Sequence, residues 1–188
     1  MPSQPKKLLT PAEYLALERR AEFKSEYFAG EMFAMAGASQ RHNLIAANII
    51  RALGNQLLER PCSVYPSDMR VKIGKINKYT YPDITVVCGE EQFEDDRHDA
   101  LLNPMVIIEI LSESTEAYDR GKKFEHYQSL DSLREYVLIS QDPYRVEQYI
   151  RQDDRMWTYS EFHQAEEIVH FPTIDCALPL RDIYAKVA

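Results

Sequence analysis

The strongest constraint on the fold is a nearly continuous apolar run, PMVIIEIL, at residues 104–111. Its length fits a β-strand, and a strand that is apolar at almost every position must be covered on both faces of its sheet. The segment EYVLIS at residues 135–140 has the same character. The chain is therefore predicted to build a central sheet with other elements packed on each side.

Other segments indicate helices and strands in an order that identifies the fold class. Apolar residues between 41 and 59 recur every three to four positions, which predicts an amphipathic helix that Pro61 ends. Thr10, Pro11 and Glu13 form a capping box, which predicts a short helix over residues 10–20. Further predicted elements are a hairpin around Ala29-Gly30, strand segments at 62–73, 79–89, 145–151 and 155–162, a loop at 90–103, and helices at 119–130 and 178–187. This order predicts an α+β (α/β) domain with a mixed β-sheet flanked by helices.

Composition is that of an ordinary globular protein, with 188 residues of which 45% are apolar and 28% charged. The length predicts a single domain over residues 10–188, after a flexible N-terminal tail at residues 1–9. The sequence has neither an 18-residue apolar run nor an apolar secretory segment, so we expect no membrane association. The three cysteines, Cys62, Cys88 and Cys176, are far apart and form no CxxC pair. This spacing argues against a disulfide scaffold or a zinc ribbon and favours the reducing cytoplasm.

Charge and missing motifs exclude several function classes. The net charge of −8 argues against a protein that coats nucleic acid through its phosphates, but it allows a transient, metal-assisted contact at an acidic site. The sequence contains no P-loop, no dinucleotide-binding glycine pattern, no GxSxG and no HExxH. One basic cluster, interpreted here as a solvated face, comprises Arg70, Lys72, Lys75 and Lys78.

Glu109 is the residue that most clearly breaks a local rule, because it interrupts the apolar run at 104–111. Burying a carboxylate costs several kcal/mol unless it is paired or binds a metal. A structural ion pair near the strand end is one explanation. A metal ligand is the other.

Asp83 is a second candidate acid, because Pro82-Asp83 opens the strand that contains Ile84–Cys88. Proline is tolerated at the first residue of a strand, so Asp83 enters the sheet at its rim. A turn aspartate would be the ordinary interpretation of a Pro-Asp pair. If the strand of Glu109 lies nearby, however, the two carboxylates could converge on one Mg²⁺, which takes one or two carboxylates together with water and phosphate oxygens.

Lys123 is the third candidate. If Asp119 caps the helix predicted at 119–130, then Arg120, Lys122 and Lys123 all lie in its first turn. Cations there oppose the helix dipole, so this arrangement indicates a site rather than a folding device. An Asp119–Lys123 pair at i,i+4 is compatible with the same function.

Two further residues are candidates for accessory roles. His42 stands at the start of the long helix, where a capping or surface position is the alternative. Glu31 follows the Ala-Gly turn, where an exposed strand charge is the alternative.

The candidate residues, taken in order, resemble a known family. Asp83 in a Pro-Asp pair, Glu109 in an apolar strand and a lysine soon after are similar to the PD-(D/E)XK nuclease superfamily. The runs VIIEILS at 106–112, YDRGKKFEHY at 118–127 and EYV at 135–137, together with Gly30-Glu31 and His42, resemble more closely the Uma-two family of restriction-endonuclease-like bacterial proteins. The resemblance covers about residues 10–185.

The resemblance implies a metal-dependent endonuclease that hydrolyses nucleic acid, with DNA expected as a transient substrate. It implies that Asp83 and Glu109 hold Mg²⁺ or Mn²⁺ and that Lys123 is catalytic, with Glu31 and His42 as accessory residues. The superfamily's usual lysine lies two residues after the acid, where this chain has Leu111, so Lys123 would take its place from the following helix. The alternative is a binding module that kept the nuclease fold without its chemistry. By analogy with nucleases that cut both strands, a homodimer is one alternative for the oligomeric state. The aromatic residues of the predicted edge strands, Tyr149, Trp157 and Tyr159, would then form its interface; ordinary core positions are the other alternative.

Overall fold

The structure analysed is a computed structural model that describes residues 8–142 and 144–187. The helices are α1 (Pro11–Glu18), α2 (Gln40–Leu57), α3 (Glu116–Tyr118), α4 (Phe124–Tyr127) and α5 (Leu180–Ile183), with a 3-10 turn η1 (Gly74–Ile76) and a π-helical turn η2 (Asp119–Lys123). The strands are β1 (Ser25–Phe28), β2 (Glu31–Ala34), β3 (Cys62–Pro66), β4 (Arg70–Ile73), β5 (Lys78–Thr80), β6 (Ile84–Cys88), β7 (Ala100–Leu101), β8 (Val106–Ile110), β9 (Glu135–Ile139), β10 (Val146–Arg151), β11 (Trp157–Phe162), β12 (Ile168–Phe171) and β13 (Cys176–Pro179).

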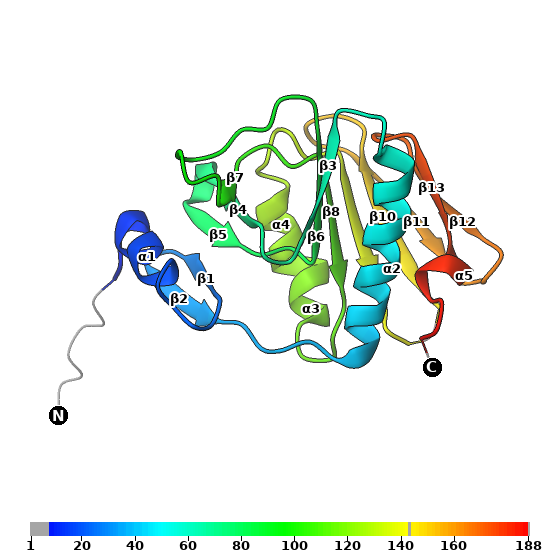
Figure 1. The fold of residues 1–188 in the computed structure, drawn as a ribbon, viewed down its shortest axis with the longest axis horizontal. Helices are drawn as coiled ribbons and strands as arrows, with labels where there is room; N and C mark the ends of the chain where they lie inside the picture. Colours follow the sequence, from blue (N-terminus) through cyan, green and yellow to red (C-terminus); the bar gives the residue numbers. More distant parts are fainter. Residues whose placement is uncertain (1–7, 143, 188) are drawn as a thin grey trace.

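The strands form two main sheets (Figure 1). The six-stranded sheet has the order β11-β10-β9-β8-β6-β3, and the five-stranded sheet has the order β2-β1-β5-β4-β7. Strands β8 and β9 are parallel, whereas the other neighbours in the six-stranded sheet are antiparallel. The prediction of an α+β fold with a mixed sheet flanked by helices is therefore confirmed.

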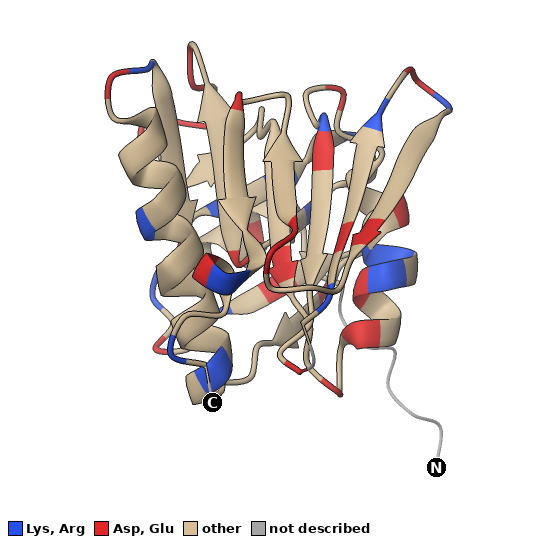
Figure 2. Cartoon of the chain, turned by 90° about the vertical axis from the view of Figure 1, so that its right-hand side faces the viewer, with Lys and Arg blue, Asp and Glu red and all other residues tan. Residues whose placement is uncertain are grey.

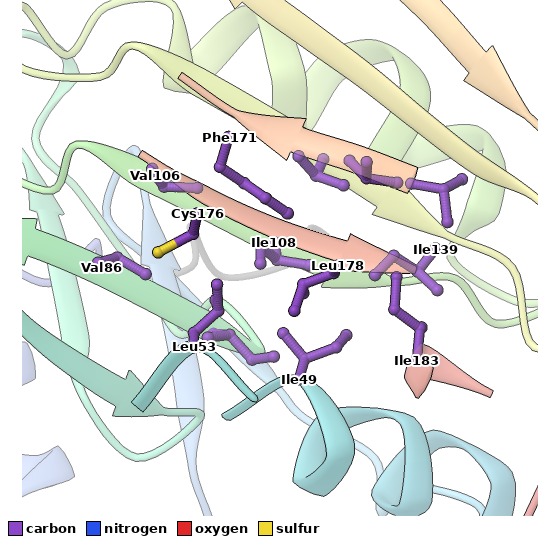
Figure 3. Close-up of a cluster of buried hydrophobic side chains, with 14 of the residues drawn as sticks. Ile49, Leu53, Val86, Val106, Ile108, Ile139, Phe171, Cys176, Leu178 and Ile183 are labelled. Carbon is purple, nitrogen blue, oxygen red and sulfur yellow. The ribbon is translucent and has the colours of Figure 1, made fainter. Parts of the chain in front are cut away.

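The central strand β8 is buried on both faces, as its apolar run predicted. Val106, Ile108 and Ile110 belong to a core shared with α2, the β12–β13 hairpin and α5, and Figure 3 shows Ile108 close to side chains of α2 and β13. Ile107 on the opposite face belongs to a second core, which α4 and β4 complete. Each fully buried Ile or Val contributes about 1.5–3 kcal/mol, so both layers hold β8 in place.

The N-terminal elements follow the predicted local signals. The capping box of α1 is present, with reciprocal bonds between Thr10 and Glu13. Strands β1 and β2 form the predicted hairpin, in which Ala29 and Gly30 adopt positive φ angles of 51° and 88°. At Gly30 a Cβ atom would also come within 2.7 Å of Leu8, so this turn requires glycine.

Residues 1–7 of the flexible tail predicted at 1–9 lie outside the described residues. Leu9 is described, and its N–H donates to the Gly30 carbonyl at 2.8 Å. Among the described residues, no helix combines the length and apolar character needed to cross a membrane.

Several boundaries differ from the sequence-based expectation. The two strand segments predicted at 62–73 and 79–89 each break near a proline, Pro66 or Pro82, and each supplies one strand to each sheet. The hairpin of β12 and β13 was not predicted, because each strand has only four residues. The long helix starts with Ser39 as its cap and ends at Leu57, two residues earlier than expected.

A disulfide joins Cys62 to Cys88, which the sequence spacing did not predict. The two residues lie directly opposite each other on β3 and β6, so the bond ties an edge strand to its neighbour. Cys176 is a free, buried thiol. One crosslink in a chain with two large apolar cores supplements the core and does not replace it.

Candidate active site

Asp83 and Glu109 lie at one end of the β6–β8 ladder. Ile84 pairs with Ile108 at the end of this antiparallel ladder, so Asp83 and Glu109 are the next residues outward, and the charge of Asp83 acts on Glu109. Asp83 is fixed there because its Oδ2 accepts a hydrogen bond from the Ile110 N–H at 2.7 Å. The two acids, 26 positions apart in the chain, are thus brought together by the strand order.

Glu109 is buried and contacts two donors. Its Oε1 lies 2.8 Å from Lys123 Nζ and accepts a hydrogen bond of 2.8 Å from the Tyr127 hydroxyl. Burial raises the pKa of Glu109 to about 8, and the carboxylates of Asp83 and Asp119 add to this rise, against the opposing effect of Lys123. Glu109 therefore retains its proton at pH values where an exposed carboxyl group is ionised.

The π-helical turn η2 places Lys123 and Asp119 on the same inner side. Lys123 Nζ lies 3.2 Å from Asp119 Oδ1, and the Tyr136 hydroxyl donates to the Asp119 carbonyl at 3.0 Å. Burial alone would lower the pKa of Lys123. The carboxylates of Glu109, Asp119 and Glu26 outweigh burial and raise that pKa well above its ordinary value, so Lys123 is an ammonium ion. Such π-helical turns occur often at functional sites.

The helix that carries Lys123 differs from the predicted one at its start. Residues 116–127 are continuously helical through α3, η2 and α4, so Asp119 lies inside the helix and is not its cap. The three cations therefore do not lie in a first turn, and the prediction that they oppose the helix dipole there is wrong. Arg120 instead pairs with Glu116 and Glu147, and Lys122 pairs with Glu125, whereas Lys123 points to the candidate centre.

His42, in the first turn of α2, contacts the other acid. Its Nε2 lies 3.0 Å from Asp83 Oδ1, and the two side chains are 14% and 16% exposed. The His42 backbone N–H donates to the Ser39 side chain, which fixes the helix start. Within the described part of the chain, His42 Nδ1 is buried without a hydrogen-bond partner.

The second accessory residue, Glu31, lies half-buried at the start of β2, opposite Phe28. Its part in the site stays a prediction. The acid of this hairpin whose charge acts on Lys123 is Glu26 on β1, which the sequence reasoning missed. Glu26 and Glu31 both sit in short strands beside aromatic residues, and no local pattern distinguishes them.

The donor set fits a hard divalent cation bound by few protein ligands. The two carboxylates of Asp83 and Glu109 present only oxygen donors, as Mg²⁺ and Mn²⁺ prefer. The described residues contain no cluster of three or more His, Cys, Asp or Glu arranged to hold a metal. A bound ion would therefore complete its shell with water or substrate oxygens, as Mg²⁺ commonly does.

Comparisons with known proteins agree with this fold. A crystal structure described as "a putative nuclease belonging to DUF820" from Anabaena variabilis has the same fold, with a TM-score of 0.79 at 21% sequence identity, covering 96% of this chain and 99% of that one. The model of the Uma2 family, described as "Putative restriction endonuclease", matches residues 11–181. The chain belongs to the Uma2 family.

Two relatives from Synechocystis sp. (strain ATCC 27184 / PCC 6803 / Kazusa) are similar over most of their length. "Uncharacterized protein sll1609" is 41% identical over 155 residues, which cover 82% of this chain and 88% of the relative. "Uncharacterized protein slr1290" is 33% identical over 187 residues, which cover 100% of this chain and 97% of the relative.

Proposed function

We propose that this protein is a metal-dependent endonuclease that hydrolyses phosphodiester bonds of nucleic acid, with DNA as its transient substrate. The observation that carries the proposal is the meeting of Asp83 and Glu109 on adjacent strands, with the Lys123 ammonium 2.8 Å from Glu109. Membership of a family described as "Putative restriction endonuclease" supports the same activity.

In this proposal Asp83 and Glu109 hold Mg²⁺ or Mn²⁺. When bound, such an ion polarises a phosphoryl oxygen and lowers the pKa of a coordinated water. His42 and the Ile110 N–H each bind one oxygen of Asp83, so they orient this carboxylate. Tyr127 orients Glu109 in the same way.

Lys123 would stabilise the charge that develops on the phosphoryl oxygens. Its ammonium stands next to Glu109, where it is shielded from bulk water and strongly favoured in the charged form. A preorganised cation in a poorly solvated site is worth far more than one in water. Lys123 thus supplies, from a helix, the ammonium group that the superfamily's usual lysine supplies from the position of Leu111.

The chain's charge fits a transient contact better than a tight complex. Its net charge is −8, and Figure 2 shows acidic and basic positions interspersed over the strands and helices in that view. Affinity for duplex DNA grows with the number of phosphates that cations neutralise. Binding is therefore expected to depend on the divalent ion at the site.

A plasmid-nicking assay tests the proposal. Supercoiled plasmid is incubated with Mn²⁺ or Mg²⁺ and either the wild type, Asp83→Asn or the control Asp131→Asn, which changes an exposed acid that pairs with Lys75 on the surface. The wild type and the control should nick the plasmid, and Asp83→Asn should lose at least 90% of the rate. Equal rates in the wild type and Asp83→Asn would assign the activity to a contaminant.

The second candidate function is a binding module without catalysis. The missing three-ligand cluster among the described residues favours it, as does the direct contact of Lys123 with the carboxylate that would hold the ion. A thermal melt distinguishes the two, because a ligand that binds only the folded state raises Tm. No Tm shift at millimolar Mn²⁺ would favour the binding module.

Cutting both strands of a duplex would suit a homodimer, and β11 is an edge of the six-stranded sheet. Of the aromatic residues on β10 and β11, Tyr149 and Trp157 pack against the core around Phe124, whereas Tyr159 is 47% exposed. Size-exclusion chromatography of the wild type and Tyr159→Lys tests this interface. A single monomer peak for the wild type would contradict it.

A further inference from the structure

Lys78 on β5 is a buried lysine that the sequence placed on a solvated face, and its side chain is only 1% exposed. The interpretation of the basic cluster as a solvated face is wrong for Lys78 and for Arg70, which is also buried. Lys78 Nζ lies 2.6 Å from the Tyr118 hydroxyl, 3.4 Å from His126 Nδ1 and 3.5 Å from Glu26 Oε2. Burial and the charges of Lys78 and Lys122 lower the pKa of His126, so its neutral ring can accept a hydrogen bond from Lys78. A buried ammonium group needs such partners, because it is costly to desolvate.

Glu26 connects Lys78 to the candidate active site. Its Oε1 accepts a hydrogen bond from the Thr80 hydroxyl on β5. Thr80 Oγ1 in turn lies 3.4 Å from the Tyr127 hydroxyl, which donates to Glu109. Because the Thr80 and Tyr127 protons already go to Glu26 and Glu109, this contact fixes Tyr127 by close packing.

Glu26 is also influenced by both buried lysines. Burial alone would raise its pKa, but the charges of Lys123 and Lys78 and the Thr80 hydrogen bond outweigh burial and lower it. Glu26 is thus an anion shared between two cations, one on β5 and one beside Glu109. Removing Lys78 would leave Lys123 as the main partner of Glu26.

We propose that Lys78 is a positioning residue of the site, which holds Glu26 away from Lys123 so that the Lys123 ammonium stays on Glu109. What the site then does rests on the function proposed above. In this arrangement the five-stranded sheet is part of the active site, because β1 and β5 set the position of groups on the helix and on β8. Without Lys78, the Lys123 ammonium moves towards Glu26 and leaves Glu109 without a neighbouring cation.

This displacement has an unusual signature in the variant Lys78→Met. Glu109 loses the ammonium that competes with a divalent ion, so at a pH where Glu109 is ionised the Kd for Mn²⁺ should fall by about threefold or more. The nicking rate should fall about 10- to 100-fold, as for other residues that orient metal ligands, because Lys123 no longer stands by the phosphate. General damage to the fold would instead weaken Mn²⁺ binding and nicking together.

The experiment compares Lys78→Met with two other variants by calorimetric titration of Mn²⁺ and by plasmid nicking. The control, Lys72→Met, removes a lysine on the neighbouring strand that pairs with Glu94 at 2.6 Å. It should leave the Mn²⁺ Kd and the rate within twofold of wild type. The double variant Glu26→Gln/Lys78→Met removes the pull on Lys123 and should recover at least a third of the wild-type rate. If Lys78→Met does not fold, Thr80→Val loosens Glu26 with little change in volume and should shift both quantities in the same directions.

Two results would overturn the inference. One is a Lys78→Met protein that behaves like Lys72→Met in both assays. The other is a parallel loss of Mn²⁺ binding and nicking that the double variant does not repair. A crystal structure of metal-free Lys78→Met separates this inference from the proposed function. In that crystal structure Lys123 Nζ should lie nearer to Glu26 than to Glu109, and this expectation holds whether or not the wild type binds Mn²⁺ or nicks DNA. If Lys123 has not moved, that result alone refutes the positioning role of Lys78.

Discussion

Replacing Glu109 by glutamine should stabilise the protein, and the gain should depend on pH. The pKa of Glu109 is raised from its ordinary 4.5 to about 8, so the folded state retains a proton that the unfolded chain releases at lower pH. Its contribution to stability is complete below pH 4.5 and is lost as the pH rises towards 8. At about 1.36 kcal/mol per pH unit, the loss is about 3 kcal/mol at pH 7 and less than about 1 kcal/mol at pH 5.

The glutamine side chain does not ionise, so Glu109→Gln does not lose stability through this titration as the pH rises. It should therefore exceed the wild type by about 3 kcal/mol at pH 7, or about 6–12 °C in Tm for a chain of this length, and by less than about 1 kcal/mol at pH 5. Guanidinium unfolding in EDTA at pH 5, 6, 7 and 8 measures the difference, with the exposed Glu113→Gln as the control. A gap between Glu109→Gln and wild type that stays constant with pH, or a less stable variant at pH 7, would refute the assigned burial and charge of Glu109.

Three further predictions follow from the same structure. Mn²⁺ must displace the Glu109 proton, so the apparent affinity for Mn²⁺ should rise about tenfold per pH unit up to about pH 8 and then level off. Titration calorimetry measures this profile, and a pH-independent affinity would exclude Glu109 as a ligand. Reduction of the Cys62–Cys88 bond, which closes a loop across 26 positions, should lower the free energy of unfolding by about 3.5 kcal/mol; an unchanged Tm in dithiothreitol would contradict its role. Asn48→Ala removes two hydrogen bonds that the Asn48 amide donates from α2 to the carbonyls of Ile183 and Ala185. The free energy of unfolding in denaturant should fall by about 1–3 kcal/mol. The control Gln56→Ala, at an exposed position of the same helix, should lower it by less than about 1 kcal/mol.

Both candidate acids could be selected from the sequence, Glu109 because it violates a local pattern and Asp83 because of its place at the rim of the sheet together with Glu109. Glu109 interrupts an apolar strand, and Asp83 follows a proline at the start of another. Their proximity could not be predicted, because it depends on β6 lying beside β8, a choice of strand order that no segment encodes alone. The same limit hid the Cys62–Cys88 bond, which needs the pairing of β3 with β6.

Lys123 was selected for a reason that the structure does not support. The prediction assumed a helix that starts at Asp119, whereas a π-helical turn within a longer helix brings Asp119 and Lys123 to Glu109. A π-helical turn adds one residue per turn and leaves no simple period in the sequence. The catalytic role of Lys123, which the family resemblance implied, stays a prediction, and the structure places its ammonium 2.8 Å from Glu109.

Lys78 and Glu26 could not be recognised from the sequence. Both lie in short strands of the five-stranded sheet, and their burial results from packing of this sheet against the helix at 116–127. A basic cluster such as that around Lys78 is usually solvated, and only tertiary contacts distinguish the exception. The central strands and the long helix were predictable, by contrast, because their apolar periodicity is local.

The central claim is that Asp83 and Glu109 together hold one divalent cation. A crystal grown at pH 8 or above and soaked in Mn²⁺ tests it directly through the anomalous signal of the metal. The account predicts one strong peak within about 2.5 Å of a carboxylate oxygen from each residue, and its disappearance in Asp83→Asn. A soaked crystal with no peak there, or with one that touches neither acid, would contradict it.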